Sequence, residues 1–177
     1  MPEPPHALLL TGPPGVGKTT VLRRAAGELS NLDLRGFTTR EIRQAGQRVG
    51  FRIETFDGES DVLAHVKIRS SHKVSKYGVD VEALDRVLAA QFPRKRASVV
   101  LIDEIGKMEC LSARFVDTVE RLLESESVFV ATVALRGGGF IDEVKRRRDV
   151  QLWRVSRSNR DEMPERVAEW VRSGLGS

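Results

Sequence analysis

The sequence predicts an α/β domain in which helices flank a mainly parallel sheet and an antiparallel hairpin extends that sheet. Two observations lead to this class. Apolar runs typical of buried strands alternate with segments whose apolar residues recur at helical spacing. One pair of strand-like segments is separated only by a short glycine-containing turn, which is typical of a hairpin. The chain has 177 residues, so we expect a single domain over residues 1–177.

The first half of the chain begins with a strand and a helix and then continues as strands. The expected elements are a strand at Ala7–Thr11, a helix at Lys18–Leu29, hairpin strands at Phe37–Arg43 and Val49–Phe56 around Ala45–Gln47, and a strand at Val62–Ile68. The stretch Arg69–Gly78 has no clean period, so we expect a loop over the surface there.

In the second half, helices with polar caps alternate with apolar strands. Asp80 and Ser112 each precede an apolar helical period and are expected to be N-caps. The expected elements are a helix from Asp80 to Phe92, a strand at Ser98–Ile102, a helix at Ser112–Glu124, a strand at Val128–Val133, a short helix at Ile141–Arg147 after Gly137–Gly139, a strand at Val150–Val155 and a helix at Asp161–Val171. This alternation predicts the parallel part of the sheet.

The composition argues against several classes of protein. The net charge is only +4, and no apolar run approaches the roughly 20 residues that span a bilayer. The residues before Gly12 lack the basic leader of a secretory signal, and Cys110 is the only cysteine. We therefore expect a cytoplasmic protein without a membrane partner. The basic runs 94–96 and 145–148 have no interleaved aromatics and are interpreted as solvated faces, not as a nucleic-acid site.

A glycine-rich loop follows the first strand and matches the pattern G-x-x-x-x-G-K-[ST] at every fixed position. Its residues are Gly12, Pro13, Pro14, Gly15, Val16, Gly17, Lys18 and Thr19. Such a loop closes its backbone N–H groups around phosphates, and the helix after it presents its positive end. We expect Lys18 to reach the β- and γ-phosphates and the Thr19 hydroxyl to bind Mg²⁺.

Two acids end the apolar strand that begins at Ser98. Asp103 is expected to hold Mg²⁺, because a carboxylate at the end of a parallel strand faces the same crevice as the glycine loop. Glu104 is expected to accept a proton from an attacking water, which is the step that hydrolysis needs. Lys107, three residues later, is a candidate to offset charge on the transferred phosphoryl group.

Other polar residues remain candidates without an assigned role: Arg43, Arg48, Lys76, Arg136, Arg157 and Arg160. The arginines of the hairpin and those after the last strand are expected to line the rims of a polyphosphate crevice. Tyr77 is the aromatic residue expected to meet a nucleobase. The three histidines are scattered along the chain and predict no histidine metal site.

Several segments, in the same order, resemble the thermophile-type nucleoside-triphosphatases, a family with a human cancer-related relative. They are the glycine loop at Gly12, the run G-F-T-T-R-E-I-R from Gly36, K-Y-G-V-D-V from Lys76, D-E-I-G-K-M-E from Asp103 and N-R-D from Asn159. The resemblance covers nearly the whole chain, and the hairpin and D-E-I-G-K-M-E segments are much more particular than the glycine loop.

The resemblance implies a RecA-like P-loop NTPase core and Mg²⁺-dependent hydrolysis of ATP, GTP, CTP, UTP and TTP to the diphosphate and phosphate. It also implies that the nucleotide site is completed by Leu101, Ile102, Asp103, Glu104, Ile105, Gly106 and Lys107. Two alternatives stay open: a small P-loop kinase whose acceptor pocket includes Arg69–Tyr77, and a nucleotide-gated RNA-binding module. The motifs predict neither base preference nor oligomeric state.

Overall fold

The computed structural model describes residues 5–92 and 97–176 of the chain. The strands are β1 (Ala7–Thr11), β2 (Leu34–Gln44), β3 (Gln47–Thr55), β4 (Ser60–His65), β5 (Lys73–Val74), β6 (Tyr77–Val79), β7 (Val99–Ile105), β8 (Val128–Val133) and β9 (Val150–Arg154). The helices are α1 (Lys18–Glu28), α2 (Val81–Gln91), α3 (Ala113–Glu124), α4 (Gly139–Arg146) and α5 (Met163–Leu175), with a 3₁₀ turn η1 at Glu109–Leu111.

The strands of the described residues form one sheet in the order β5-β6-β4-β3-β2-β7-β8-β1-β9. β1 pairs in parallel with β8 and β9, and β7 pairs in parallel with β8 and with the start of β2. The other pairs, from β2 to β5, are antiparallel. The predicted α/β class, with a mainly parallel core and an antiparallel extension, is therefore confirmed.

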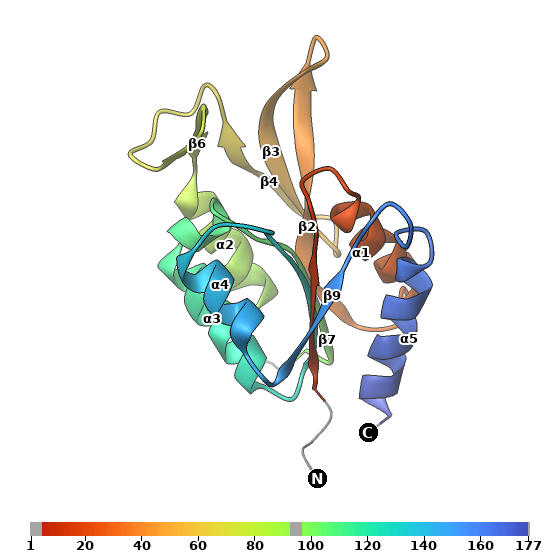
Figure 1. Ribbon diagram of the computed structural model, residues 1–177. Coiled ribbons are helices and arrows are strands. Elements are labelled where there is room, and N and C mark those ends of the chain that lie inside the picture. The colour runs from red at the N-terminus through yellow and green to blue at the C-terminus, as the bar shows by residue number, and fades with distance from the viewer. Residues whose placement is uncertain (1–4, 93–96, 177) are drawn as a thin grey trace.

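Helices cover both faces of the parallel core, with α1 and α5 on one side and α2, α3 and α4 on the other (Figure 1). Each side has its own apolar cluster: Leu8 and Leu10 pack toward α1 and α5, whereas Leu9 packs with the cluster that holds Phe115 of α3. This double coverage explains why β1 and β8 are apolar without alternation. None of the helices in the described ranges is long and apolar enough to cross a membrane.

Both predicted N-caps are confirmed. The Asp80 carboxylate accepts a hydrogen bond from the backbone N–H of Ala83 at 2.9 Å, and the Ser112 hydroxyl accepts one from Phe115 at 3.0 Å. These bonds satisfy N–H groups that the first turn of a helix leaves without a backbone partner. The start of α2 and the start of α3 are thereby set by the sequence itself.

β2 takes part in both halves of the sheet. Its first residues, Leu34–Phe37, pair in parallel with Val99–Ile102, and the remainder pairs with β3 as the predicted hairpin. The strand therefore begins three residues before the predicted start at Phe37. Figure 1 shows the hairpin reaching well beyond the helices, so it forms a wall above the carboxyl ends of the parallel strands.

The stretch predicted as a surface loop, Arg69–Gly78, instead contains β5 and the start of β6. The prediction that Tyr77 meets a nucleobase was wrong, because its side chain is buried. Its ring packs edge-on against Phe51 with centroids 5.3 Å apart, and its hydroxyl accepts a hydrogen bond from Arg48 Nε at 3.0 Å. Tyr77 thus fastens the small hairpin to β3. The run 94–96 lies outside the described residues.

Candidate active site

The glycine loop lies between β1 and α1, which is the context that its phosphate-binding motif requires. Gly17 adopts φ +112°, a left-handed conformation that glycine enters without steric cost, and α1 begins at the next residue. Gly17 has no side chain to cap the helix, so the first N–H groups of α1 are left for an anion. The loop therefore presents backbone donors and a helix N-terminus at one point.

Lys18 links this loop to the acidic strand. Its side chain is 8% exposed, and its ammonium donates a hydrogen bond to the Gly12 carbonyl at 2.7 Å. The same Nζ lies 3.7 Å from Glu104 Oε2. Because both partners are at the carboxyl ends of strands, the ammonium is held at the mouth of the loop.

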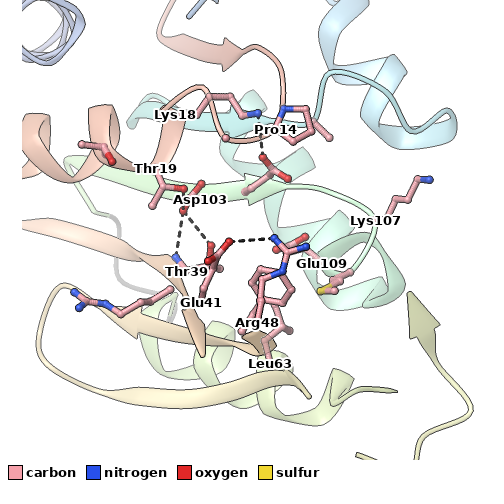
Figure 2. Close-up of a pocket in the computed structure, with 18 of the residues that line it drawn as sticks. Pro14, Lys18, Thr19, Thr39, Glu41, Arg48, Leu63, Asp103, Lys107 and Glu109 are labelled. Atoms are coloured by element: carbon pink, nitrogen blue, oxygen red, sulfur yellow. Dashed lines mark hydrogen bonds and ion pairs between the residues drawn. The ribbon is translucent and has the colours of Figure 1, made fainter. Parts of the chain in front are cut away.

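Asp103 is only 1% exposed, and its carboxylate accepts hydrogen bonds from residues of α1, β2 and β8. The Thr19 hydroxyl donates to Oδ2 at 2.9 Å, and the N–H and hydroxyl of Thr39 donate to the same oxygen at 3.2 and 3.1 Å (Figure 2). The Thr132 hydroxyl donates to Oδ1 at 2.6 Å. Every one of these donors is neutral.

The residues around Asp103 fit a magnesium ion. A hydroxyl and a carboxylate in direct contact are hard oxygen ligands, and Mg²⁺ in phosphate-binding sites uses one or two protein oxygens together with phosphates and water. Within the described ranges, Asp103 has no cationic partner, so its negative charge remains available for a cation. In those ranges no group of three or more His, Cys, Asp or Glu side chains is arranged to hold a metal ion, so an ion there would need phosphate and water to complete its coordination.

Two further carboxyl groups meet beside Asp103. Burial raises the pKa of Glu104; Lys18 opposes this shift and the charge of Asp103 adds to it. Glu109 is 6% exposed, and its burial, together with the nearby charge of Glu104, raises its pKa to about 8. At neutral pH Glu109 is therefore mainly protonated, and Glu104 has a neutral carboxyl group beside it.

Gly106 is the reason that both carboxyl groups can approach one point. A Cβ atom on Gly106 would lie 2.9 Å from Glu104 Oε1 and 3.0 Å from Glu109 Oε2. The first contact is shorter than real Cβ atoms show and the second is tighter than most, although the carboxyl groups end flexible side chains and can move. The glycine thus leaves a space between two acids at the edge of the site.

A Gly106→Ala substitution should lower the rate of the reaction at this site by about tenfold or more, because a displaced Glu104 loses its alignment with the attacking group. The free energy of unfolding should change little, since the displaced atoms are side-chain ends. Steady-state kinetics and urea unfolding of the two proteins measure the two effects. An unchanged kcat would show that the position of Glu104 is insensitive to this space. Gly27→Ala, in α1 with nothing within 4 Å of its Cβ position, is the matched control.

A cavity of about 1050 Å³ opens at this end of the sheet. Of the predicted site residues, it is lined by Pro14, Gly15, Gly17, Lys18, Thr19, Asp103, Glu104 and Lys107. A second cavity, of about 310 Å³, lies on the other side of the loop against Pro13, Pro14, Gly15, Val16 and the residues 154–157. The glycine loop therefore separates two spaces that a phosphate chain could connect.

Not every predicted site residue lines a cavity. The side chains of Leu101, Ile102 and Ile105 are fully buried in the core, where they hold β7 in place. Gly12 belongs to the loop backbone, and its carbonyl binds Lys18. Lys107 lines the larger cavity, but Figure 2 shows its ammonium directed away from Lys18 and Asp103. Its catalytic role stays a prediction.

Two arginines of the hairpin, Arg43 and Arg48, share one carboxylate partner, Glu41. Glu41 accepts hydrogen bonds from Arg43 Nε and Nη2 at 2.9 and 2.7 Å and from Arg48 Nη1 at 3.0 Å, and these bonds lower the pKa of Glu41. After the last strand, Arg160 Nη1 donates to the Val16 carbonyl at 3.3 Å, and Arg157 lines the smaller cavity. Arg43 and Arg48 therefore line the larger cavity and Arg157 the smaller one, whereas Arg160 lines neither. Lys76 lies over the Tyr77 ring, 5.5 Å from its centroid.

Thr39, Thr132 and Glu109 also belong to the site but were not predicted from the sequence. Thr39 is on β2 and Thr132 on β8, the two strands beside β7, so both flank Asp103 in the sheet. Only the strand order reveals this, and the linear sequence does not specify it. A signal for Glu109 was present in the D-E-I-G-K-M-E segment, where its acid follows Glu104 by five residues.

A family model described as NTPase matches residues 7–168, which include every residue of the site. The chain belongs to this NTPase family. Among members of the NTPase family, the nucleoside-triphosphatase THEP1 of Thermotoga sp. (strain RQ2) is 36% identical over 171 residues, which cover 96% of this chain and 97% of that protein. The predicted family is thereby confirmed.

Solved structures of the NTPase family agree with the fold. The crystal structure of THEP1 from the hyperthermophile Aquifex aeolicus matches with a TM-score of 0.80 at 32% identity, covering 93% of this chain and 98% of that one. The solution structure of a human cancer-related nucleoside triphosphatase matches with a TM-score of 0.81 at 31% identity, covering 94% and 97%. These matches confirm the predicted P-loop fold.

Proposed function

We propose that the chain hydrolyses nucleoside triphosphates to the diphosphate and phosphate, with Mg²⁺ as cofactor. The observation that carries this proposal is the contact of Lys18 with Glu104, 3.7 Å apart, at the mouth of a phosphate-binding loop. This contact supports a site in which a cation for the phosphates lies beside a carboxylate for the attacking water. The name nucleoside-triphosphatase, which the relatives carry, supports the same reaction.

The binding step uses the backbone and Lys18. The N–H groups of the loop and of the first turn of α1 hold the phosphate oxygens. Lys18 exchanges the Gly12 carbonyl and Glu104 for oxygens of the β- and γ-phosphates. Thr19 and Asp103 would hold Mg²⁺, which supplies positive charge to the phosphate oxygens as charge develops on them.

The chemical step is an in-line attack of water on the γ-phosphorus. A bond forms between the water oxygen and the phosphorus, and the bond from that phosphorus to the oxygen bridging the β-phosphate breaks. The electron pair of the broken bond stays on the diphosphate. Glu104 accepts the proton that the water loses, and its raised pKa makes it a stronger proton acceptor than an ordinary carboxylate.

The nucleoside occupies the smaller cavity beside residues 154–157, on the other side of the loop from Glu104. The loop contacts phosphates and not bases, which supports acceptance of ATP, GTP, CTP, UTP and TTP alike. We also infer a cytoplasmic location, which the lone cysteine, Cys110, supports.

A kinase remains the second candidate because the larger cavity also has apolar lining residues. They are Phe51, Leu63, Val74 and Met108, and water as the nucleophile does not need them. Val74 belongs to the segment predicted to form an acceptor pocket. In that reaction an acceptor hydroxyl would replace the attacking water, and the phosphoryl group would leave on the acceptor.

The test is the release of inorganic phosphate and of diphosphate from the five triphosphates, with Mg²⁺ or with a chelator, alone and with a panel of hydroxyl acceptors. Lys18→Ala is the blank. Hydrolysis predicts equal amounts of phosphate and diphosphate that vanish with the chelator. Diphosphate formed in excess of phosphate with an acceptor would show a kinase, and no diphosphate under any condition would rule out both.

A further inference from the structure

The cationic side chains around the larger cavity differ in whether they have partners. Arg23 donates to the Thr39 carbonyl at 2.7 Å, and Arg40 pairs with Glu54 at 3.1 Å. Arg43 and Arg48 are both held by Glu41. These arginines are therefore fixed to the hairpin wall, and a phosphate would have to displace a carboxylate or carbonyl to use them.

Arg136 and Lys107 differ from these arginines. Both line the cavity, and neither has a hydrogen bond or an ion pair with any residue that the structure describes. Lys107 is directed away from Lys18 and Asp103 (Figure 2). Arg136 is exposed on the loop between β8 and α4. β8 is the neighbour in the sheet of β7, which carries Asp103 and Glu104.

The segment before Arg136 is firmly anchored. The backbone N–H of Ala134 donates to the carbonyl of Ile105, the residue after Glu104, at 3.1 Å. Lys145 Nζ donates to the carbonyls of Ala134 and Leu135 at 3.1 and 2.8 Å. Arg136 therefore begins from a point that is fixed relative to Glu104.

The segment after Arg136 is made of three glycines. A Cβ on Gly137 would lie 2.3 Å from Ile141 Cδ1, so a larger residue there would have to displace the Ile141 side chain. Gly138 has φ +66°, which places it in the left-handed region, and α4 begins at the following residue. With an anchored segment on one side and glycines on the other, the Arg136 side chain can turn into the cavity without unfolding a helix.

In a loose phosphoryl-transfer transition state, charge spreads over the γ-phosphoryl oxygens, and a planar guanidinium can contact two of them at once. We propose that Arg136 is a catalytic residue that contacts the γ-phosphoryl oxygens in the transition state. This inference rests on the proposed triphosphate hydrolysis. It also gives a role to the glycine triplet Gly137–Gly139, which the phosphate loop and the acids leave unexplained.

The test compares Arg136→Ala with the matched control Arg148→Ala, an exposed arginine that lines neither cavity. Loss of one transition-state donor costs about 100-fold in kcat, so we expect that fall in Arg136→Ala, with KM within about threefold of the wild-type value. Arg136→Lys should recover little of the lost rate, because an ammonium cannot contact two phosphoryl oxygens in the planar geometry of a guanidinium. Free guanidinium ion added to Arg136→Ala should restore part of that rate.

A second readout is the affinity for a nucleoside diphosphate with aluminium fluoride, a transition-state analogue, against that for the diphosphate alone. Only the first should weaken in Arg136→Ala. An unchanged kcat, or a lower kcat with unchanged analogue affinity, would overturn the role of Arg136 while leaving hydrolysis in place. An inactive wild-type protein would instead overturn the proposed function.

Discussion

Replacing Glu104 with glutamine should lower kcat for triphosphate hydrolysis by about 1000-fold, within the range that a positioned general base contributes. Glutamine keeps the size and the oxygen of the side chain but cannot take a proton from water. Binding of the Mg²⁺–nucleotide complex should stay within a few fold. The substitution removes the charged partner that lies 3.7 Å from Lys18. Binding is little affected, because Lys18 would exchange that partner for phosphate oxygens when the nucleotide binds.

The surroundings of Glu104 make this effect larger than for an exposed carboxylate. Burial raises its pKa, while Lys18 opposes the rise. If Lys18 turns toward the phosphates as we propose, that opposition weakens and the affinity of Glu104 for a proton increases. On this proposal, nucleotide binding would strengthen the base.

The measurement is single-turnover phosphate release, which isolates the chemical step, together with nucleotide binding by calorimetry. Glu120→Gln, an exposed position of α3 outside both cavities, is the matched control and should behave as the wild type. Wild-type turnover in Glu104→Gln with binding retained would show that the proton leaves by another route, such as the phosphate itself.

The local parts of this site could be predicted from the sequence because each depends on neighbours along the chain. The glycine loop, its helix and the apolar strand ending in Asp103 and Glu104 are contiguous patterns, and the structure has them as predicted. The caps Asp80 and Ser112 are local for the same reason. A pattern of that kind carries its own geometry.

The parts that failed depend on which strands become neighbours. Thr39 and Thr132 reach Asp103 only because β2 and β8 flank β7. Tyr77 looked exposed in a polar stretch, yet pairing of β6 with β4 buries it against Phe51. Non-local pairing of this kind is decided by the packing of the whole sheet and leaves no period in the sequence.

The stability of the ligand-free protein should fall as the pH rises through the range between the two pKa values of Glu109. In the unfolded chain its carboxyl group titrates near 4.5, and in the folded protein near 8. Between these values the folded state holds a proton that the unfolded state has lost. The contribution of Glu109 to the free energy of unfolding is therefore largest below its unfolded pKa and falls by about 5 kcal/mol in total once the pH exceeds 8.

Glu109→Gln should remove most of this slope, because glutamine fills the same space and carries no charge at any pH. At about pH 5 the variant should be less stable than the wild type by about 1 kcal/mol, since the buried amide brings donors without partners. At about pH 9 it should be the more stable of the two, because the wild type must then bury a charge beside Glu104. The two stability curves are expected to cross.

Urea unfolding without Mg²⁺ and nucleotide, at several pH values between about 5 and 9, measures both curves. Glu143→Gln, an exposed position on α4, is the control and should run parallel to the wild type. Glu104 also has a raised pKa, so a small slope of the same sign should persist in Glu109→Gln. If the wild type and Glu109→Gln ran parallel throughout, Glu109 would be charged in the folded protein, and the carboxyl pair could not hold the proton that keeps Glu104 free as a base.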